Sequence, residues 1–160
     1  MADTSPSSES ASQLEILFGD LVRCETRLYN GLNDWLRERH GIVTSQYEFL
    51  HYLHGHPGAR VADLAAEFAV GVGAISKGTD RLERQGWVAR QPNPADRRSS
   101  LLVLTEEGAR LTEAAEQTFS EHVTELIAGT LDASQIAAVA QALSLLRSTL
   151  ERAQVGTPTG

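Results

Sequence analysis

The sequence predicts a mainly helical domain in which four helices are followed by a two-stranded hairpin and two further helices. Three observations support this fold class. Apolar residues recur at spacings of three, four and seven over most of the chain, which is the period of an amphipathic helix. Two short apolar runs, Trp87–Arg90 and Leu101–Leu104, flank a turn-rich segment and are typical of a hairpin. Glycine and proline clusters separate the helical stretches where the chain must turn.

Length and composition exclude several classes of protein. The 160 residues suffice for one domain with extended arms. No apolar run approaches the roughly 20 residues of a membrane span. The N-terminus lacks the basic and apolar regions of a secretory signal. A single cysteine, Cys24, excludes an intramolecular disulfide and an all-cysteine metal site. We therefore expect a soluble cytoplasmic protein without a membrane partner.

The two ends of the chain are expected to be tails. Residues 1–12 contain five serines and almost no large apolar side chains, which predicts a disordered tail, and residues 154–160 are expected to be flexible. Residues 13–153 are expected to form a single domain. Its first helix, over about 13–40, is expected to end at Gly41. Its apolar stripe consists of Leu14, Leu17, Phe18, Leu21, Leu28, Leu32, Trp35 and Leu36.

Three shorter helices are expected next. Thr44 or Ser45 can cap the second helix, which should end at the breaker cluster 55–58. A third helix follows over 61–68. The fourth runs from about residue 73 to 85 and is closed by Gly86. Gly78 lies inside the fourth helix, where glycine costs about 1 kcal/mol relative to alanine, so we expect it to permit close packing against a neighbouring helix.

The last two helices complete the pattern. Thr105 precedes two acidic residues that favour a helix start, and Asp132 with Gln135 forms a capping-box variant that opens the sixth helix. The end helices, about 13–40 and 106–153, carry apolar stripes that the small central unit, about 44–105, cannot cover. The sequence therefore predicts a homodimer joined by these end helices.

The charge distribution points to a local basic patch on an acidic body. The net charge is −7, but residues 77–98 hold six basic and three acidic residues, a local charge of +3. Lys77, Arg81 and Arg84 lie on one side of the fourth helix, and apolar residues lie on the other. Small residues at its N-terminal end would let the backbone approach the base edges of a DNA major groove. The predicted contacts are Gly73, Ala74, Ser76, Lys77, Arg81 and Arg84; the alternative is an ordinary solvated helix.

The hairpin tip is the second candidate for DNA contact. Arginines on an ordered loop can enter the minor groove, attracted by its negative potential. Asp96 could orient such an arginine through a charge-assisted hydrogen bond. The predicted contacts of the tip are Asp96, Arg97, Arg98 and Ser99; the alternative is a charged surface turn.

The segment ADLAAEFAVGVGAISKGTDRLERQGWVARQPNPADRRSSLLVLTEEG resembles the winged-helix core of the MarR family of bacterial transcriptional regulators. With the flanking helices, the resemblance covers about residues 14–152. It implies a winged helix-turn-helix fold with long dimerisation helices. It also implies a dimeric repressor, or less often an activator, that binds double-stranded DNA at a pseudo-palindromic operator. In the family, a small molecule, metal or oxidant releases the operator.

Carried over by position, the resemblance assigns roles to six residues. Ser76, Lys77 and Arg81 would meet the major groove. Arg97 and Arg98 would meet the minor groove, with Asp96 supporting the wing arginine. The stretch 71–78 departs from the family pattern, because it is rich in glycine and has fewer hydroxyl and amide side chains for reading bases.

Three further groups are candidate effector sites. Tyr29, Trp35, Tyr47 and His51 could line a pocket for an aromatic small-molecule effector, or be ordinary core residues. His51, His54 and His56 have spacings that could bind zinc, or simply form a polar helix end. Cys24, next to Arg23 and near Arg27, could be a redox sensor or an idle thiol.

Catalysis is not expected. The sequence contains no GxSxG, P-loop or HExxH motif, so we expect neither an enzyme nor a cofactor. The alternatives to a repressor released by a small molecule are a zinc- or redox-responsive regulator of the same fold, and a winged-helix module for protein interaction.

Overall fold

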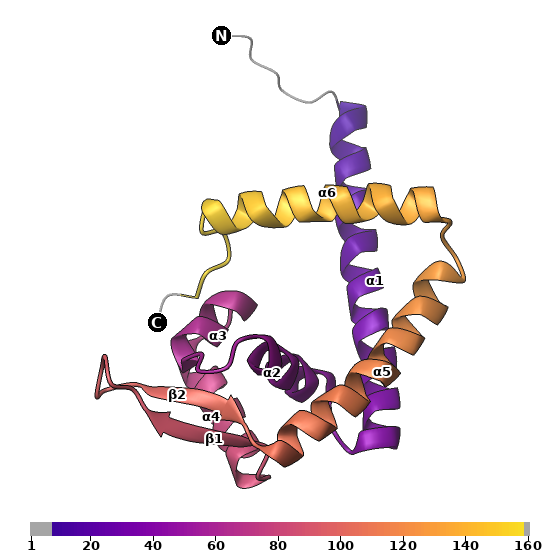
Figure 1. The fold of residues 1–160 in the computed structure, drawn as a ribbon. Helices are drawn as coiled ribbons and strands as arrows, with labels where there is room; N and C mark the ends of the chain where they lie inside the picture. The colour runs from indigo at the N-terminus through magenta and orange to yellow at the C-terminus, as the bar shows by residue number, and fades with distance from the viewer. Residues whose placement is uncertain (1–7, 159–160) are drawn as a thin grey trace.

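The computed structural model describes residues 8–158 and confirms the predicted order of four helices, a hairpin and two helices (Figure 1). The described elements are α1 (Ser8–His40), α2 (Thr44–Gly55), α3 (Val61–Phe68), α4 (Val72–Arg84), β1 (Val88–Pro92), β2 (Ser100–Leu104), α5 (Glu106–Ala128) and α6 (Ala133–Arg152). The helix-turn-helix is formed by α3 and α4, and the wing by β1 and β2.

Two predicted boundaries were wrong. Helix α1 begins at Ser8, so residues 8–12 are helical and do not belong to a disordered tail; residues 1–7 lie outside the described part. Between Glu9 and the apolar stripe no glycine or proline interrupts the helix, and extending an existing helix is favourable even for polar residues. Helix α2 is preceded by Val43, whose N–H donates to the side chain of Gln46 at 2.9 Å. Thr44 is buried within the helix.

The winged unit, which consists of α2, α3, α4, β1 and β2, has its own apolar core. Its fully or almost fully buried side chains come from all five of its elements and are Leu50, Leu53, Leu64, Ile75, Leu82, Val88 and Leu102. A second cluster of Leu36, Ile42, Tyr47 and Ala115 joins α1, α2 and α5. Trp87 and Leu111 pack against both clusters. The winged unit therefore shares one interior with the C-terminal end of α1 and the N-terminal half of α5.

Gly78 allows α4 to pack closely on α2. A Cβ atom on Gly78 would lie 2.7 Å from Cε2 of Phe49, a contact that real Cβ atoms do not make. The expected close packing of α4 on a neighbouring helix, here α2, is therefore confirmed. Helix α4 ends at Arg84 with Gln85 as its C-cap, so the predicted cap Gly86 lies one residue further along, with φ +79° in the left-handed region that favours glycine.

The wing is a two-stranded antiparallel sheet that is tied to the segment before α3. The pairs run from Val88 with Leu104 to Pro92 with Ser100. On the other side of β2, Leu102 donates its N–H to the carbonyl of Ala59 at 2.8 Å and accepts from the N–H of Gly58 at 2.9 Å. Strand β2 is thus held along both edges.

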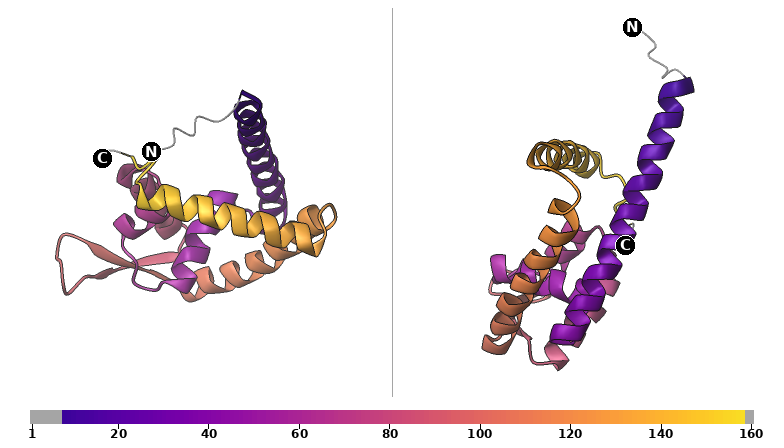
Figure 2. Two further views of the ribbon diagram at one scale, coloured as in Figure 1. Left: turned by 90° about the horizontal axis from the view of Figure 1, so that it is seen from above. Right: turned by 90° about the vertical axis from the view of Figure 1, so that its right-hand side faces the viewer.

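The end helices project from the winged unit (Figures 1 and 2). Capping of α6 is as predicted, since Asp132 accepts from the N–H of Gln135 and donates its own N–H to the side chain of Gln135. Helices α5 and α6 meet at a bend of 109°. Within residues 8–158 no single helix is long and apolar enough to cross a membrane, and only the bent pair α5–α6 passes that test when taken together.

Candidate nucleic-acid interface

The basic side of α4 faces solvent. Ile75, Thr79 and Leu82 are fully buried against the winged core, so the opposite side of the helix is exposed. Lys77 and Arg81 lie there, and the side chain of neither has a hydrogen bond or an ion pair with another residue of the described range 8–158. Their charges are therefore available to an external anion.

The other predicted residues of α4 have more varied surroundings. Gly73 and Ala74 are exposed in the first turn, where a ligand could approach the backbone. Ser76 is half-buried, and its carbonyl accepts from the hydroxyl of Thr79 at 2.9 Å. Arg84 is exposed and donates from Nε to the carbonyl of Asp80 at 3.3 Å.

The wing tip is ordered by side chains that bond the backbone. Asp96 Oδ1 accepts from the N–H of Arg98 at 2.9 Å, and the carbonyl of Asp96 accepts from the N–H of Ser99 at 3.1 Å. The carboxylate thus holds the backbone of Arg98, and the predicted bond to an arginine guanidinium was wrong. Within the described residues the guanidinium groups of Arg97 and Arg98 have no partner and are exposed.

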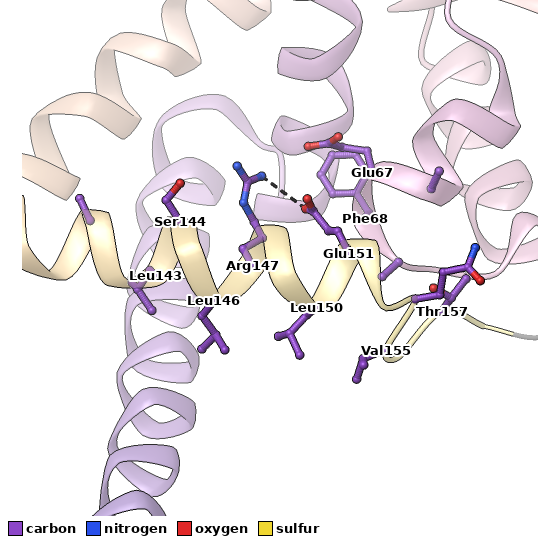
Figure 3. A pocket seen from close by; sticks show the side chains of 14 residues that line it. Glu67, Phe68, Leu143, Ser144, Leu146, Arg147, Leu150, Glu151, Val155 and Thr157 are labelled. Carbon is purple, nitrogen blue, oxygen red and sulfur yellow. Dashed lines mark ion pairs between the residues drawn. The ribbon is translucent and has the colours of Figure 1, made fainter. Parts of the chain in front are cut away.

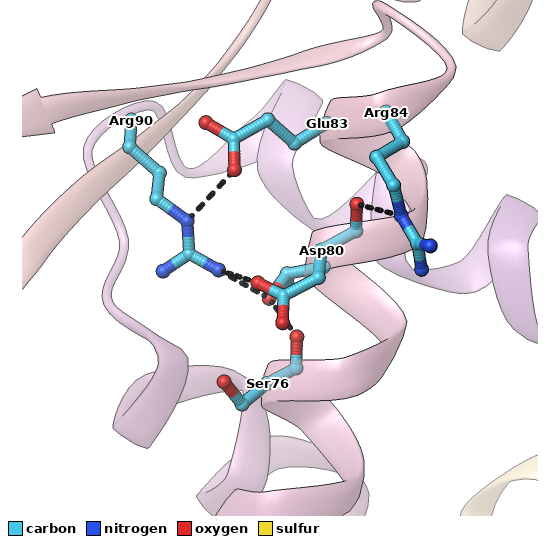
Figure 4. A network of polar contacts seen from close by, with 6 residues as sticks. Ser76, Asp80, Glu83, Arg84 and Arg90 are labelled. Carbon is cyan, nitrogen blue, oxygen red and sulfur yellow. Dashed lines mark hydrogen bonds and ion pairs between the residues drawn. The ribbon is translucent and has the colours of Figure 1, made fainter.

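Sequence reasoning missed Asn93. Its Nδ2 donates to Ser99 Oγ at 2.8 Å, and its Oδ1 accepts from the N–H of Ala95 at 3.0 Å, so it closes the base of the tip. An asparagine directly before a proline in a turn is a signal for this role. Sequence reasoning also missed the surroundings of Arg90, which reaches from β1 to Asp80 and Glu83 on α4 (Figure 4).

The four residues proposed for an effector pocket have different surroundings. Trp35 stacks on His122 with ring centroids 3.4 Å apart, and Tyr47 is buried between His51 and Phe119. Tyr29 alone lines a cavity of about 570 Å³ between α1, α2 and α4. The cavity is lined by Tyr29, Ser45, Glu48, Phe49, Phe68, Val70, Ala74, Ile75, Lys77, Gly78 and Arg81.

Burial changes the titration of the groups around this cavity. It raises the pKa of Glu48, although a hydrogen bond from the Tyr29 hydroxyl, 3.5 Å away, acts in the opposite direction. Burial, together with the charge of Glu48, raises the pKa of Tyr29. Outside this cavity, burial raises the pKa of Tyr47 to about 12. The tyrosines therefore stay neutral near pH 7 and can donate hydrogen bonds.

The three histidines proposed as zinc ligands diverge. Nδ1 of His51 and of His54 lie 2.8 and 3.3 Å from the same oxygen of Glu116. His56 instead stacks on Tyr52, with ring centroids 4.3 Å apart. Within residues 8–158 no group of three or more His, Cys, Asp or Glu side chains is placed to hold a metal ion. The redox role of Cys24, which is exposed on α1, stays a prediction.

A second hollow, of about 840 Å³, lies between α3 and the C-terminal half of α6 (Figure 3). Arg147 and Glu151, which are 3.8 Å apart, point from α6 toward the side of Phe68. Leu143, Leu146 and Leu150 also line the hollow and lie on the other side of α6 from Arg147 in Figure 3. The apolar side chains of α6 thus border an open hollow beside α3 and stay partly exposed.

Comparison with known proteins agrees with this geometry. A model of the MarR family matches residues 40–99. The multiple antibiotic resistance protein MarR of Escherichia coli K12 is 30% identical over 106 residues, which cover 66% of this chain and 73% of that protein. The transcriptional repressor MdtR of Bacillus subtilis is 35% identical over 71 residues, 44% of this chain and 46% of that protein.

Solved structures share the fold. A mutant of E. coli MarR complexed with operator DNA superposes with a TM-score of 0.74 and 27% identity, over 82% of this chain and 94% of that chain. A MarR family regulator from Streptomyces coelicolor in complex with DNA gives a TM-score of 0.79 at 22% identity, over 91% and 94% of the two chains, and this supports the fold alone. From its sequence and its architecture, the chain belongs to the MarR family of winged helix-turn-helix transcriptional regulators.

Proposed function

We propose that this protein is a homodimeric repressor that binds a pseudo-palindromic operator and leaves it when a small molecule binds. Its action is binding and involves no catalysis. One observation carries the proposal: four cationic side chains on α4 and the wing tip are exposed and have no partner within the described residues. They are Lys77, Arg81, Arg97 and Arg98.

The placement of these cations fits a duplex. The N-terminal turns of α4 combine small exposed residues with cations, which suits a helix in a major groove. The wing tip offers two guanidinium groups on a loop that is already ordered, so little entropy is lost when one of them enters a minor groove. The acidic remainder of the chain repels DNA from the rest of the protein surface.

A second copy of this chain is the occupant that we propose for the exposed apolar stripes. On α1, Leu17 and Phe18 are 63% and 69% exposed, which is unusual for large apolar side chains that lie in one stripe. On α6, Leu143 and Leu146 are 42% and 46% exposed and line an open hollow. Two-fold pairing of these helices would place two copies of α4 in successive major grooves, about 34 Å apart.

The dimer can be tested with a matched pair of substitutions on α1. Phe18→Glu places a charge in the stripe and is expected to give a monomer by size-exclusion chromatography with light scattering. Ile16→Glu is the control, because Ile16 is 62% exposed and lies about 160° around the helix from Phe18. A monomeric wild type, or dimers of unchanged stability in both variants, would refute the proposed interface.

The cavity between α1, α2 and α4 is the proposed effector site. Lys77 and Arg81 belong both to its lining and to the proposed DNA face, so an occupant competes directly with DNA for these cations. Tyr29, Phe49 and Phe68 supply aromatic walls, which favour an aromatic ligand. To empty most operators the ligand must favour the released state by several kcal/mol.

DNA binding is tested by selecting bound sequences from random duplexes and then measuring affinity against salt. Arg98→Ala should lower the slope of log K against log salt by about two for a dimer, since each protomer loses one phosphate contact. Arg152→Ala, on α6, is the control and should leave the slope unchanged. Failure of the wild type to bind any duplex in dilute buffer, or binding that ignores salt, would refute the proposal. Small molecules are then screened for release of the selected duplex.

A further inference from the structure

The recognition helix α4 carries acids as well as cations. Asp80 and Glu83 lie on it between Lys77 and Arg84, and their side chains are 53% and 42% exposed. An exposed carboxylate close to a DNA groove repels phosphate, and this repulsion offsets the attraction of a neighbouring cation. A helix with this sequence therefore needs some means of removing two negative charges from its DNA face.

Arg90 meets both acids from the neighbouring strand (Figure 4). Its Nη2 contacts Asp80 Oδ1, and its Nε lies 3.1 Å from Glu83 Oε2. The same Nη2 also donates to Thr79 Oγ1 at 3.3 Å, and Thr79 is fully buried. The side chain of Arg90 is itself only 28% exposed. One guanidinium thus pairs with both carboxylates of α4 through separate N–H groups, which lysine could not reproduce with the same geometry.

The fold does not depend on this contact to join α4 to β1. The two elements are connected through Gly86, and Trp87 donates its N–H to the carbonyl of Leu82 at 3.0 Å. Leu82 and Val88 are buried in the same core. Partly exposed ion pairs add little to stability, so a purely structural role explains little of this three-way contact.

We propose that Arg90 is a positioning residue for DNA binding. It draws the carboxylates of Asp80 and Glu83 toward β1 and neutralises them, so that the adjacent basic side of α4 presents Lys77 and Arg81 to phosphate unopposed. This inference rests on the proposed DNA-binding function. It identifies a residue that acts on DNA affinity through two others and touches no DNA itself.

The test is a double-mutant cycle on the full-length dimer with the selected duplex. Arg90→Gln should weaken binding about fivefold to tenfold at 50 mM salt and only about twofold at 300 mM, because added salt screens the uncovered carboxylates. Asp80→Asn with Glu83→Gln should bind at least as tightly as the wild type. In that neutral background Arg90→Gln should cost less than twofold, and Arg90→Lys alone, which keeps the charge but not the geometry of the two contacts, should lose less affinity than Arg90→Gln.

Controls separate this role from a structural one. Arg110→Gln removes an exposed ion pair with Glu106 on α5 and should leave affinity unchanged. Equal losses from Arg90→Gln in the acidic and neutral backgrounds, or a loss independent of salt, would overturn the inference, as would weaker binding by the Asp80→Asn, Glu83→Gln variant. A wild type that binds no duplex would refute the proposed function instead, so the two failures are distinguishable.

Discussion

Replacing Gly108 by alanine should destabilise the protein strongly. The residue lies in the first turn of α5, and a Cβ atom there would lie 2.0 Å from the carbonyl oxygen of Trp87 and 2.8 Å from its carbonyl carbon. Both obstacles are backbone atoms, so no side-chain rotation relieves the clash. The start of α5 must move about 1 Å from the start of β1 before the closest contact reaches 3.0 Å. That movement also strains the hydrogen bond from the N–H of Thr105 to Trp87, now 3.0 Å long.

The magnitude follows from three contributions. Overpacking of this kind costs about 3 kcal/mol or somewhat more when the backbone must move. A weakened hydrogen bond adds up to about 1 kcal/mol. Alanine regains about 1 kcal/mol of helix propensity. The expected net loss is about 3 kcal/mol in the free energy of unfolding.

Urea denaturation at a fixed protomer concentration measures this loss, since the stability of a dimer depends on concentration. Gly31→Ala is the matched control: it also lies in a helix, but nothing lies within 4 Å of its added Cβ. It should stabilise by about 0.5–1 kcal/mol. A Gly108→Ala protein as stable as the wild type would refute the argument from backbone contact.

Three further substitutions test the site and its supports. Burial raises the pKa of Glu48, so the stability that its protonated form contributes at low pH is lost as the pH rises through that pKa. The Glu48→Gln protein should therefore melt at a higher temperature than the wild type at about pH 7, and at the same temperature as the wild type at about pH 3. A thermal melt in which the difference between the two proteins grows toward low pH would contradict this sign. Asp96→Ala removes the bond to the N–H of Arg98 and should weaken DNA binding, by gel shift, while costing about 1 kcal/mol or less in stability; unchanged affinity would show that the tip needs no such bond. His122→Phe should keep the stacking on Trp35 and stabilise by about 1 kcal/mol in urea, because neither buried ring nitrogen has a hydrogen bond within the described residues. A loss of stability would show instead that the approach of its Nδ1 to Glu125 Oε2, at 3.6 Å, stabilises the fold.

The sequence predicted those features that depend on neighbours along the chain. Periodicity identified every described helix, and local turn signals identified the hairpin and the capping box at Asp132. The close approach at Gly78 was also predictable, because glycine inside a helix needs a packing reason. The start of α1 at Ser8 was not predicted. A serine-rich composition does not show whether a helix extends into that segment from a neighbouring apolar stripe.

Contacts between distant segments were not predictable in the same way. Arg90 counts as one more positive charge in the sequence, and only the fold brings it to Asp80 and Glu83. Tyr29 and Trp35 share a helix and aromatic character, yet one borders a cavity while the other stacks on His122, because they face different neighbours around α1. The sequence predicted which charges lie on which face of a helix, but not which side chains pair with one another.

The double attachment of β2 has a mechanical consequence for the operator release that we propose. Leu102 bonds the segment just before α3 while its strand pairs with β1, so tilting the hairpin alone would break backbone bonds at its root. We therefore expect the winged unit to move as one body. Gly41 (φ +68°) marks the joint between α1 and α2, and Thr105 marks the joint between β2 and α5. Thr105 is held by hydrogen bonds to Trp87 and Gly86, so a change in the distance between the two copies of α4 would originate at Gly41.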